Sequence, residues 1–376
     1  MEINPDISGQ TVIVGLSGGV DSAVAALLLK QQGADVQALH MTNWEDDDGY
    51  CTAAEDLQDA RQVCESLKVP LHHVNFSRQY RERVFDYFLD EYRAGRTPNP
   101  DILCNREIKF GVFRQHAKRL GGSYIATGHY ARIVRSAETV ELHKARDLDK
   151  DQSYFLHAVS ADALAESIFP LGDFEKNEVR DLARRHGLRN YGKKDSTGIC
   201  FIGERPFREF LSTYLPASPG PIQTIDGEQI GEHSGLMYYT PGQRQGLGVG
   251  GRREAGDEPW YVAAKNLRDN ILIVVQGDHP ILYADELDAS NASWIGKSPL
   301  AEHASFACQV KIRYRQADQA CRVRRLAGGR LTVSFASPQR AIAPGQFAVF
   351  YDGDHCLGGA VIDRVFADSE ARQAAI

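Results

Sequence analysis

The stretch Thr11-Val-Ile-Val-Gly-Leu-Ser-Gly-Gly-Val-Asp-Ser22 decides the fold. Its first five residues form a β-branched run that is typical of a buried strand, and apolar spacing over Val20–Lys30 predicts a helix. Between them, Gly18 and Gly19 let the backbone turn sharply and bring its N–H groups against phosphate oxygens. The following helix adds its N-terminal dipole and unpaired amides. The order of strand, loop and helix therefore predicts a phosphate-binding loop over Gly15–Ser22.

Side chains of this loop carry chemistry of their own. Ser17 and Ser22 offer hydroxyl groups, and Asp21 offers a carboxylate that suits Mg²⁺ on a polyphosphate. The loop is neither a Walker A loop, which needs GK[ST], nor a GxGxxG dinucleotide loop. An ordinary glycine turn with a serine N-cap is the alternative interpretation. The predicted nucleotide-binding residues of the loop are Gly15, Leu16, Ser17, Gly18, Gly19, Val20, Asp21 and Ser22.

Strand and helix patterns alternate through the first half of the chain. The predicted strands are Val36–His40, Leu71–Val74 and Tyr124–Thr127, and the predicted helices are Ala53–Leu67 and Tyr80–Arg93. Such alternation favours an α/β fold, a doubly wound parallel sheet with helices on both faces. Ligands of these sheets bind beyond the carboxyl ends of the strands, where the glycine-rich loop lies.

In the second half of the chain, short strand-like runs replace the alternating strand and helix patterns. Three prolines in Leu215–Pro221 predict a first domain boundary, and a second falls between Gly277 and Ser293. Between the boundaries, short β-rich runs cover Gln223–Ile225, Met237–Thr240, Trp260–Ala263 and Ile271–Gln276. The last strand-like runs are Phe306–Tyr314, Cys321–Leu326, Arg330–Phe335, Ala348–Tyr351 and Gly358–Val365, which suit a small β-barrel. We predict a catalytic domain over 1–212, a small central β-rich domain over 213–282 and a C-terminal β-barrel over 283–376.

Composition excludes several classes of protein. The chain has 376 residues and a net charge of −7, which disfavours a protein that coats nucleic acid non-specifically but leaves a local basic face open. No apolar run approaches the roughly 20 residues that cross a bilayer, and the N-terminus lacks the features of a signal peptide. We therefore expect a cytoplasmic protein with no membrane partner. The seven cysteines form no CxxC pair, which disfavours a disulfide framework or a zinc ribbon.

Two cysteines lie in unusual surroundings. In Thr97–Phe110, two prolines set an extended loop that positions Asp101 and Cys104, and we expect helical sequence to resume at Glu107. A helix start beside Arg106 and Lys109 favours the reactive thiolate of Cys104, and Asp101 could act as a general acid or base. The second cysteine, Cys200, follows two lysines in a glycine-bearing loop, Lys193–Gly203. A buried structural cysteine is the alternative for each.

The loop carries a first resemblance. SGGVDS resembles the signature of the ATP pyrophosphatases, which release pyrophosphate and transfer AMP to a substrate oxygen. The resemblance implies ATP and Mg²⁺ as cofactors, with Asp21 as the metal ligand. It also implies that Met41 and Gly128 flank the adenine, although either could be core packing. Transfer of AMP to a carbonyl oxygen makes chemical sense, because the carbonyl oxygen by itself is a poor leaving group, whereas the adenylated oxygen is a good one.

Further motifs narrow the resemblance. TPNPDILCN, DSTGICFIG and TPGQRQGLGVGG together resemble the tRNA-specific 2-thiouridylases, through essentially the whole chain. The resemblance implies that Cys104 is the catalytic nucleophile, that Cys200 carries a persulfide and that Asp101 handles a proton. It also implies RNA contacts, of which Asn99, Pro100 and Asp101 meet the target base and Lys150, Asp151, Gln152, Arg313 and Tyr314 meet other parts of the tRNA.

The implied reaction is the ATP-dependent 2-thiolation of the wobble uridine, position 34 of tRNA. The uridine O2 is adenylated, and sulfur then reaches C2 either by direct attack of the Cys200 persulfide or as sulfide released when Cys104 attacks it. A Cys104–Cys200 disulfide remains for a reductant. A sulfur-carrier protein or a cysteine desulfurase would supply the persulfide. The resemblance therefore implies a tRNA-uridine 2-sulfurtransferase that converts ATP to AMP and pyrophosphate.

Local charge agrees with an RNA partner. Residues 306–330 carry seven basic side chains and one acidic one, and alternate spacing in Lys311-Ile-Arg313-Tyr-Arg315 places three cations on one strand face. A second basic cluster extends from Arg180 to Lys194. Solvated surfaces are the alternative for both. Other classes stay open, namely a pyrophosphate-loop ligase or amidotransferase acting on a small molecule, a thiol-redox protein and a non-catalytic RNA-binding module.

Overall fold

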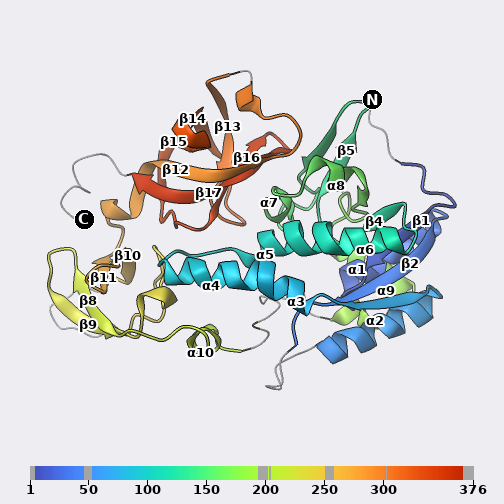
Figure 1. Ribbon diagram of the computed structural model, residues 1–376, viewed down its shortest axis with the longest axis horizontal. Helices are drawn as coiled ribbons and strands as arrows, with labels where there is room; N and C mark the ends of the chain where they lie inside the picture. Colours follow the sequence, from blue (N-terminus) through green and yellow to red (C-terminus); the bar gives the residue numbers. More distant parts are fainter. Residues whose placement is uncertain are drawn as a thin grey trace.

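The structure, a computed structural model, describes residues 5–45, 53–193, 202, 205–249, 258–301 and 303–366. Three sheets organise them: a parallel sheet in the N-terminal half, a four-stranded sheet in the middle of the chain and a larger sheet near the C-terminus (Figure 1). Within these ranges, no helix combines the length and the apolar character that a membrane span requires.

The N-terminal sheet is parallel throughout, in the order β3-β2-β1-β4-β7. Its strands are β1 (Thr11–Gly15), β2 (Asp35–Thr42), β3 (Leu71–Asn75), β4 (Tyr124–Ala126) and β7 (Ser167–Ile168). The chain builds outward from β1 to β3 and then continues on the other side of β1 with β4 and β7. The strand order therefore reverses between β1 and β4, and such a switch point is where an open α/β sheet binds its ligand. The predicted doubly wound parallel sheet is confirmed.

Alternate residues of β1 face opposite layers of the domain. Val12 and Val14 pack in one apolar cluster with α1, whereas Ile13 packs in another, as a strand with two buried faces requires. Two π-helical segments, η1 (Arg81–Phe85) and η2 (Cys104–Phe113), join shorter helices into two long ones. The α-helices are α1 (Val20–Gln31), α2 (Ala53–Leu67), α3 (Ser77–Tyr80), α4 (Asp86–Arg93), α5 (Pro100–Leu103), α6 (Arg114–Arg119), α7 (Ser153–Leu156), α8 (Ala161–Ala165), α9 (Lys176–Arg185) and α10 (Phe207–Ser212).

The central sheet has the order β10-β11-β8-β9. Its strands are β8 (Gly220–Thr224), β9 (Gln229–His233), β10 (Trp260–Asn266) and β11 (Ile271–Gln276). The strand predicted over Met237–Thr240 is wrong, because a short 3₁₀ helix, η4 (Leu236–Tyr238), occupies this position. The amide of Tyr238 donates to the carbonyl of Gly235, whose φ of 151° only glycine adopts readily. The resulting turn buries the side chains of Leu236 and Tyr238.

The C-terminal sheet closes into a barrel. Its six strands follow the order β12-β15-β14-β13-β16-β17, and β12 pairs with β17 to complete the ring, which confirms the predicted β-barrel. They are β12 (Tyr283–Trp294), β13 (Ser305–Lys311), β14 (Gln319–Arg325), β15 (Leu331–Arg340), β16 (Phe347–Asp352) and β17 (His355–Phe366). Strand β12 was not predicted, because most of its residues are small or polar. Pairing on both sides makes it a strand despite a weak propensity.

A hairpin links the first domain to the barrel. Its strands, β5 (Arg132–Arg135) and β6 (Val140–His143), follow β4, and β6 pairs with β17 through His143 and His355. Just after β6, the ammonium of Lys144 donates to the carbonyl of Gly353 at 2.9 Å and lies over the ring of Tyr351. The barrel sheet therefore continues into the parallel-sheet domain, and the two parts are held together by backbone pairing as well as by side chains.

Candidate active site

The glycine-rich loop lies at the switch point between β1 and β4 and is held by its own hydroxyl groups. The Ser17 amide donates to Ser22 Oγ at 3.2 Å, and Ser22 Oγ donates to the Gly19 carbonyl at 3.1 Å. Strand β2 fixes the loop from outside, since the Leu16 amide donates to Leu39 and His40 Nδ1 lies 2.8 Å from the Leu16 carbonyl. Within the described structure no side chain caps α1 at Gly19. The first-turn amides of α1 therefore lack a side-chain acceptor and suit an anion.

Two glycines bring backbone against backbone at this loop. Gly18 has a φ of +81°, and a Cβ there would lie 2.7 Å from the carbonyl oxygen of Asp56 on α2. Gly128, just after β4, rests on the first turn of α1, where a Cβ would lie 2.7 Å from the Ser22 nitrogen. Gly128 is thus packed against the loop, and the two glycines allow the close approach that a polyphosphate requires. The predicted contact with adenine stays a prediction.

Asp21 is engaged by two residues that the sequence analysis missed. Lys176, at the start of α9, donates to both carboxylate oxygens at 2.8 Å, and the Tyr130 hydroxyl donates to one of them at 2.9 Å. No local motif could reveal them, because they lie 155 and 109 residues from Asp21 in the chain. Among the described residues there is no group of three or more His, Cys, Asp or Glu side chains that could hold a metal ion. An Mg²⁺ ion at Asp21 would therefore take most of its ligands from phosphate and water, and this role stays a prediction.

Met41 lies at the carboxyl end of β2, the edge of the sheet that carries the loop. Its register partner on β3 is Val74, and Leu39, two residues earlier, pairs with Gly15 of β1. The side chain is half-buried and packs against the larger apolar cluster. This position is compatible with both of the interpretations that the sequence left open, an adenine contact and core packing.

The helix that carries Cys104 begins earlier than the sequence indicated. It starts at Pro100 after an extended Asn99, so the expectation that helical structure resumes at Glu107 is wrong. Proline suits the first helical position because its missing N–H has no intrahelical partner there. Cys104 consequently lies one turn inside the helix, at the start of η2, and is only 3% exposed. π-Helical turns are rare in proteins, and those that do occur are often found at functional sites.

The side chain of Asp101 is open to solvent on one side of the helix, while protein atoms crowd the rest of its surroundings. Desolvation raises the pKa of its carboxyl group, and the ammonium of Lys109 acts in the opposite direction. A raised pKa brings a carboxyl group closer to the range in which it exchanges protons at neutral pH. The side chain of Arg106 pairs with Glu107 on the helix surface. The predicted activation of Cys104 by neighbouring cations stays a prediction.

The Cys104 helix and the glycine-rich loop adjoin through Lys109 and Phe113. The Lys109 ammonium lies 3.5 Å from His129 Nε2, and burial together with this ammonium holds the pKa of His129 well below its usual range. His129 follows Gly128, which rests on the loop. Phe113, at the end of η2, has a ring carbon 3.3 Å from the position of a Cβ on Gly15. The helix that carries Asp101 and Cys104 is therefore connected at its far end to the glycine-rich loop.

Cys200 lies outside the described residues, as does Cys51. In this part of the chain the structure describes residues up to Lys193, then Ile202 alone, and then the residues from Arg205 onward. The predicted meeting of Cys104 and Cys200 accordingly stays a prediction, and so does the persulfide role of Cys200.

Two of the predicted RNA-binding residues, Asp151 and Gln152, form hydrogen bonds within the fold. Asp151 is 3% exposed, and its carboxylate accepts from the Ala145 amide at 3.0 Å and the Ser153 hydroxyl at 2.8 Å. Burial raises the pKa of this carboxyl group. Gln152 Oε1 accepts from the Tyr130 amide at 3.0 Å. Lys150 and Gln152 are both partly exposed, and the predicted RNA contacts of all three residues stay predictions.

The two segments predicted to bind RNA meet beside Cys104. The ring centroids of Phe155 and Tyr314 lie 4.5 Å apart, and Asn105 Nδ2 donates to the Phe155 carbonyl at 3.0 Å. Arg313 Nη2 donates to the Arg340 carbonyl at 3.2 Å, and its side chain stays exposed. Asn99 Oδ1 is buried without a hydrogen-bond partner in the described structure, which leaves an acceptor available next to Pro100. Residues far apart in sequence are thus gathered around the Cys104 helix.

The expected row of cations on one strand face is wrong. Strand β13 ends at Lys311, and the Ile312 amide donates to Gln316 Oε1 at 2.9 Å as the chain turns. Lys311 faces inward, with Asp151 3.9 Å and Asp318 3.8 Å away, whereas Arg315 adopts a φ of +63°. The second basic cluster is partly neutralised as well. Its Arg180 donates to main-chain carbonyls, and its Lys193 pairs with Asp56 and Asp59.

Fold and site together define a class of protein: a parallel-sheet domain with a glycine-rich loop at its switch point and a buried cysteine on a neighbouring helix, followed by two β-rich parts. Three family models match in the same order. The tRNA methyl transferase HUP domain matches residues 10–204, the tRNA methyl transferase PRC-barrel domain 208–276 and the aminomethyltransferase beta-barrel domain 284–362. Over almost its full length the chain is similar to curated proteins, and it belongs to the tRNA-specific 2-thiouridylase family.

The relatives are similar across both chains. The tRNA-specific 2-thiouridylase MnmA of Dichelobacter nodosus is 58% identical over 358 residues, 94% of each chain. That of Pseudomonas aeruginosa is 56% identical over 365 residues, 96% of each chain. Among solved structures, the U34-tRNA thiolase NcsA from Methanococcus maripaludis with its [4Fe-4S] cluster has a TM-score of 0.36 at 21% identity. That comparison covers 56% of this chain and 67% of the other. A 4-thiouridine synthetase–RNA complex with bound ATP has a TM-score of 0.34 at 18% identity, covering 55% and 50%.

Proposed function

We propose that the protein replaces the 2-oxygen of the wobble uridine of tRNA with sulfur in an ATP-dependent reaction. The observation that carries the proposal is the connection of the helix that carries Asp101 and Cys104 to the glycine-rich loop, through Lys109, His129 and Gly128. Family membership supports it, since the relatives are named tRNA-specific 2-thiouridylases. ATP supplies an AMP group that makes the uridine O2 a good leaving group.

The loop residues Gly15–Ser22 would hold the phosphates through the backbone amides of the α1 N-terminus. Lys176 neutralises Asp21 in the structure and is near enough to shift toward phosphate when a cation takes its place on the carboxylate. Met41 and Gly128 would flank the adenine. The raised pKa of Asp101 supports its role in moving a proton at the target base, which Asn99 and Pro100 would help to seat.

Sulfur would arrive as a persulfide on Cys200, received from a sulfur-carrier protein or a cysteine desulfurase. In one course the terminal sulfur attacks C2 directly, AMP leaves, and Cys104 then attacks the sulfur of Cys200 to free the thiolated base. In the other, Cys104 attacks first and releases sulfide, which displaces AMP. Both courses reduce one sulfane sulfur and oxidise two thiols to the Cys104–Cys200 disulfide, which a reductant reopens.

The remaining assignments belong to the same proposal. The catalytic domain would cover residues 1–212, the central domain 213–282 and the tRNA-contacting barrel 283–376. Lys150, Arg313 and Tyr314 would contact the tRNA, with Asp151 and Gln152 holding their neighbours in place. The reaction would take place in the cytoplasm, where tRNA and ATP are found.

The decisive experiment incubates the protein with unmodified tRNA, ATP, Mg²⁺, a cysteine desulfurase with cysteine as the source of persulfide sulfur, and a reductant, and then analyses the nucleosides. We expect 2-thiouridine at position 34 and tRNA-dependent exchange of pyrophosphate into ATP. The two methyl transferase family descriptions favour a second candidate, base methylation, so a parallel reaction with a methyl donor is included. Replacement of Cys200 with Ser should abolish thiolation but preserve exchange. A methylated product, or exchange that depends on a small metabolite instead of tRNA, would overturn the proposal.

A further inference from the structure

The segment Gly95–Pro98 joins the end of α4 to the helix that carries Asp101 and Cys104. Figure 1 shows α4 running from the parallel-sheet domain toward the two β-rich parts of the chain. The beginning of the segment is tied back to α4, because Arg96 forms an ion pair with Glu91 of that helix, which is 5% exposed. Apart from this link to α4, the segment depends on contacts from both β-rich parts.

The central part of the chain contributes two hydrogen bonds, one from strand β10 and one from the turn that precedes it. Lys265 Nζ, on β10, donates to the Gly95 carbonyl at 3.0 Å, and Thr240 Oγ1 lies 3.1 Å from Thr97 Oγ1. Packing adds to them, since a Cβ on Gly95 would lie 2.5 Å from a methyl carbon of Leu267. These contacts come from residues more than a hundred positions away in the chain.

The barrel holds the same segment from another side. The Thr97 amide donates to the Pro344 carbonyl at 2.9 Å, and Gln346 Nε2 donates to the Thr97 carbonyl at 2.8 Å. A Cβ on Gly345 would lie 2.9 Å from the Thr97 nitrogen, so the two backbones touch. Since Pro98 and Pro100 restrict the backbone that follows, the placement of Thr97 is passed on to the start of α5.

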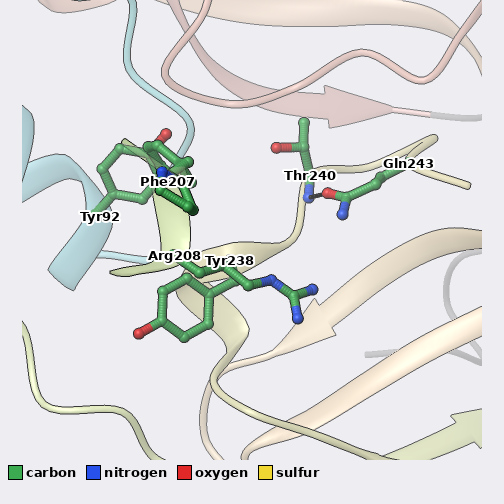
Figure 2. Close-up of a pocket in the computed structure, with 7 residues that line it drawn as sticks. Tyr92, Phe207, Arg208, Tyr238, Thr240 and Gln243 are labelled. Carbon is green, nitrogen blue, oxygen red and sulfur yellow. Dashed lines mark hydrogen bonds between the residues drawn. The ribbon is translucent and has the colours of Figure 1, made fainter. Parts of the chain in front are cut away.

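The motif TPGQ explains how Thr240 reaches Thr97. The Thr240 amide donates to Gln243 Oε1 at 2.9 Å, a bond that Figure 2 draws as a dashed line. The turn is pinned to β10, because the Gly242 amide donates to the Val262 carbonyl at 2.7 Å and the Val262 amide donates to the Gln243 carbonyl. The same strand carries Lys265. One strand and one turn therefore present both groups to the segment.

Thr240 and Gln243 line an open pocket together with Tyr92 of α4, as Figure 2 shows. The volume of this pocket is about 500 Å³. Burial alone lowers the pKa of Lys265 to about 8, so a cation is kept here against an unfavourable environment. Burying the ammonium of Lys265 costs free energy, and its hydrogen bond in the structure is to the Gly95 carbonyl. This arrangement is what we expect of a residue that fixes the position of that carbonyl.

We infer that Thr240 and Lys265 are positioning residues, which set the start of α5 and so hold Asp101 and Cys104 in register with the glycine-rich loop. The inference rests on the proposed function for its catalytic consequence. It gives the central sheet a role in the reaction without contact with the reacting atoms, and it accounts for the TPGQ motif.

The test compares Thr240→Val and Lys265→Met with the conservative variants Thr240→Ser and Lys265→Arg in the full chain. The kcat of thiolation should fall roughly tenfold to a hundredfold in the first two, as small misplacements of reacting groups produce. The KM for ATP should stay unchanged, because the loop is not part of the contact. Thr240→Ser and Lys265→Arg should restore most of the rate. Thr224→Val, which alters a threonine within the β8–β9 hairpin, is the matched control.

A second readout does not depend on activity. Iodoacetamide labelling mapped by mass spectrometry should show Cys104 reacting about fivefold faster in Thr240→Val, as the loss of one hydrogen bond predicts. Cys64, buried on α2, should react at an unchanged rate. Equal acceleration at both cysteines, or wild-type kinetics and labelling in Thr240→Val, would overturn the inference. An inactive wild-type protein would refute the proposed function instead, while the labelling still decides the positioning role.

Discussion

The glycine-rich loop and the segment Gly95–Cys104 form two sides of one candidate site, but they are held in opposite ways. Gly15–Ser22 is fixed by its own serine hydroxyls and by the neighbouring strand β2. The other segment receives its hydrogen bonds from Thr240, Lys265, Pro344 and Gln346, in two other parts of the chain. The turn of the loop is therefore held mainly by nearby groups, although Lys176 and Tyr130 reach Asp21 from distant positions. The other segment is assembled almost entirely by the tertiary fold.

This difference has a physical consequence. A locally built loop keeps its geometry when distant parts move, whereas an assembled segment responds to any change in its supports. Phosphate binding requires only preorganised amides, which a short loop provides. A base that must meet an acid and a thiol needs adjustable positioning, and a segment held from several sides allows it. Substitutions on the two sides should therefore differ in which activity they impair.

Cys104→Ser should abolish thiolation, a loss of at least about a thousandfold, because serine cannot attack a sulfane sulfur at neutral pH. Exchange of pyrophosphate into ATP in the presence of tRNA should persist, since the loop remains intact. Cys64→Ser is the matched control, a buried cysteine on α2 that should tolerate the change. Nucleoside analysis and exchange assays measure both activities. Residual thiolation by Cys104→Ser would remove this residue from the chemistry.

Lys176→Met should lower the exchange rate by roughly a hundredfold, the usual scale for the loss of one preorganised charged donor. The substitution leaves Asp21 with only the Tyr130 hydroxyl of its two observed donors. Lys68→Met, at an exposed lysine after α2, should have no effect. Steady-state exchange kinetics with ATP as the varied substrate test the prediction. An unchanged rate would show that the Lys176–Asp21 pair serves only the stability of the fold.

Gly128→Ala should lower exchange by about tenfold, because its Cβ would press on the Asp21–Ser22 backbone at 2.7 Å. The effect should appear in the KM for ATP, since the first turn of α1 shifts. Gly192→Ala, where a Cβ meets nothing within 4 Å, is the control glycine. Equal behaviour of the two variants would mean that the contact between Gly128 and the loop relaxes without consequence.

The same contrast explains what could be predicted from the sequence. Strands such as Thr11–Gly15 and helices such as Ala53–Leu67 were predicted correctly because their apolar periodicity is local. Strand β12 was missed because only its partners β15 and β17 make it a strand. Lys311 was predicted on an exposed face, whereas it points toward Asp151 across a domain contact. The partners of Asp21 lie more than a hundred residues away, so no motif contains them.

The pH dependence of stability offers the most sensitive test of the assembled side. Burial holds the pKa of Lys265 at about 8 instead of 10.5. Between these values the unfolded chain binds a proton that the folded chain has released, so the free energy of unfolding rises with pH in this window. The penalty is fully present below about pH 8. Relative to Lys265→Met, which cannot titrate, the wild type should gain roughly 1–3 kcal/mol between pH 7 and pH 10.

Urea unfolding of both proteins at several pH values gives this difference directly, because all other titrating groups are shared and cancel. The effect is smaller than the catalytic ones, since it changes stability and leaves the loop untouched. A difference that stays flat across the window would mean that solvent reaches Lys265 freely. In that case its bond to the Gly95 carbonyl would not constrain the segment, and Gly95–Cys104 would depend mainly on the barrel through Pro344 and Gln346.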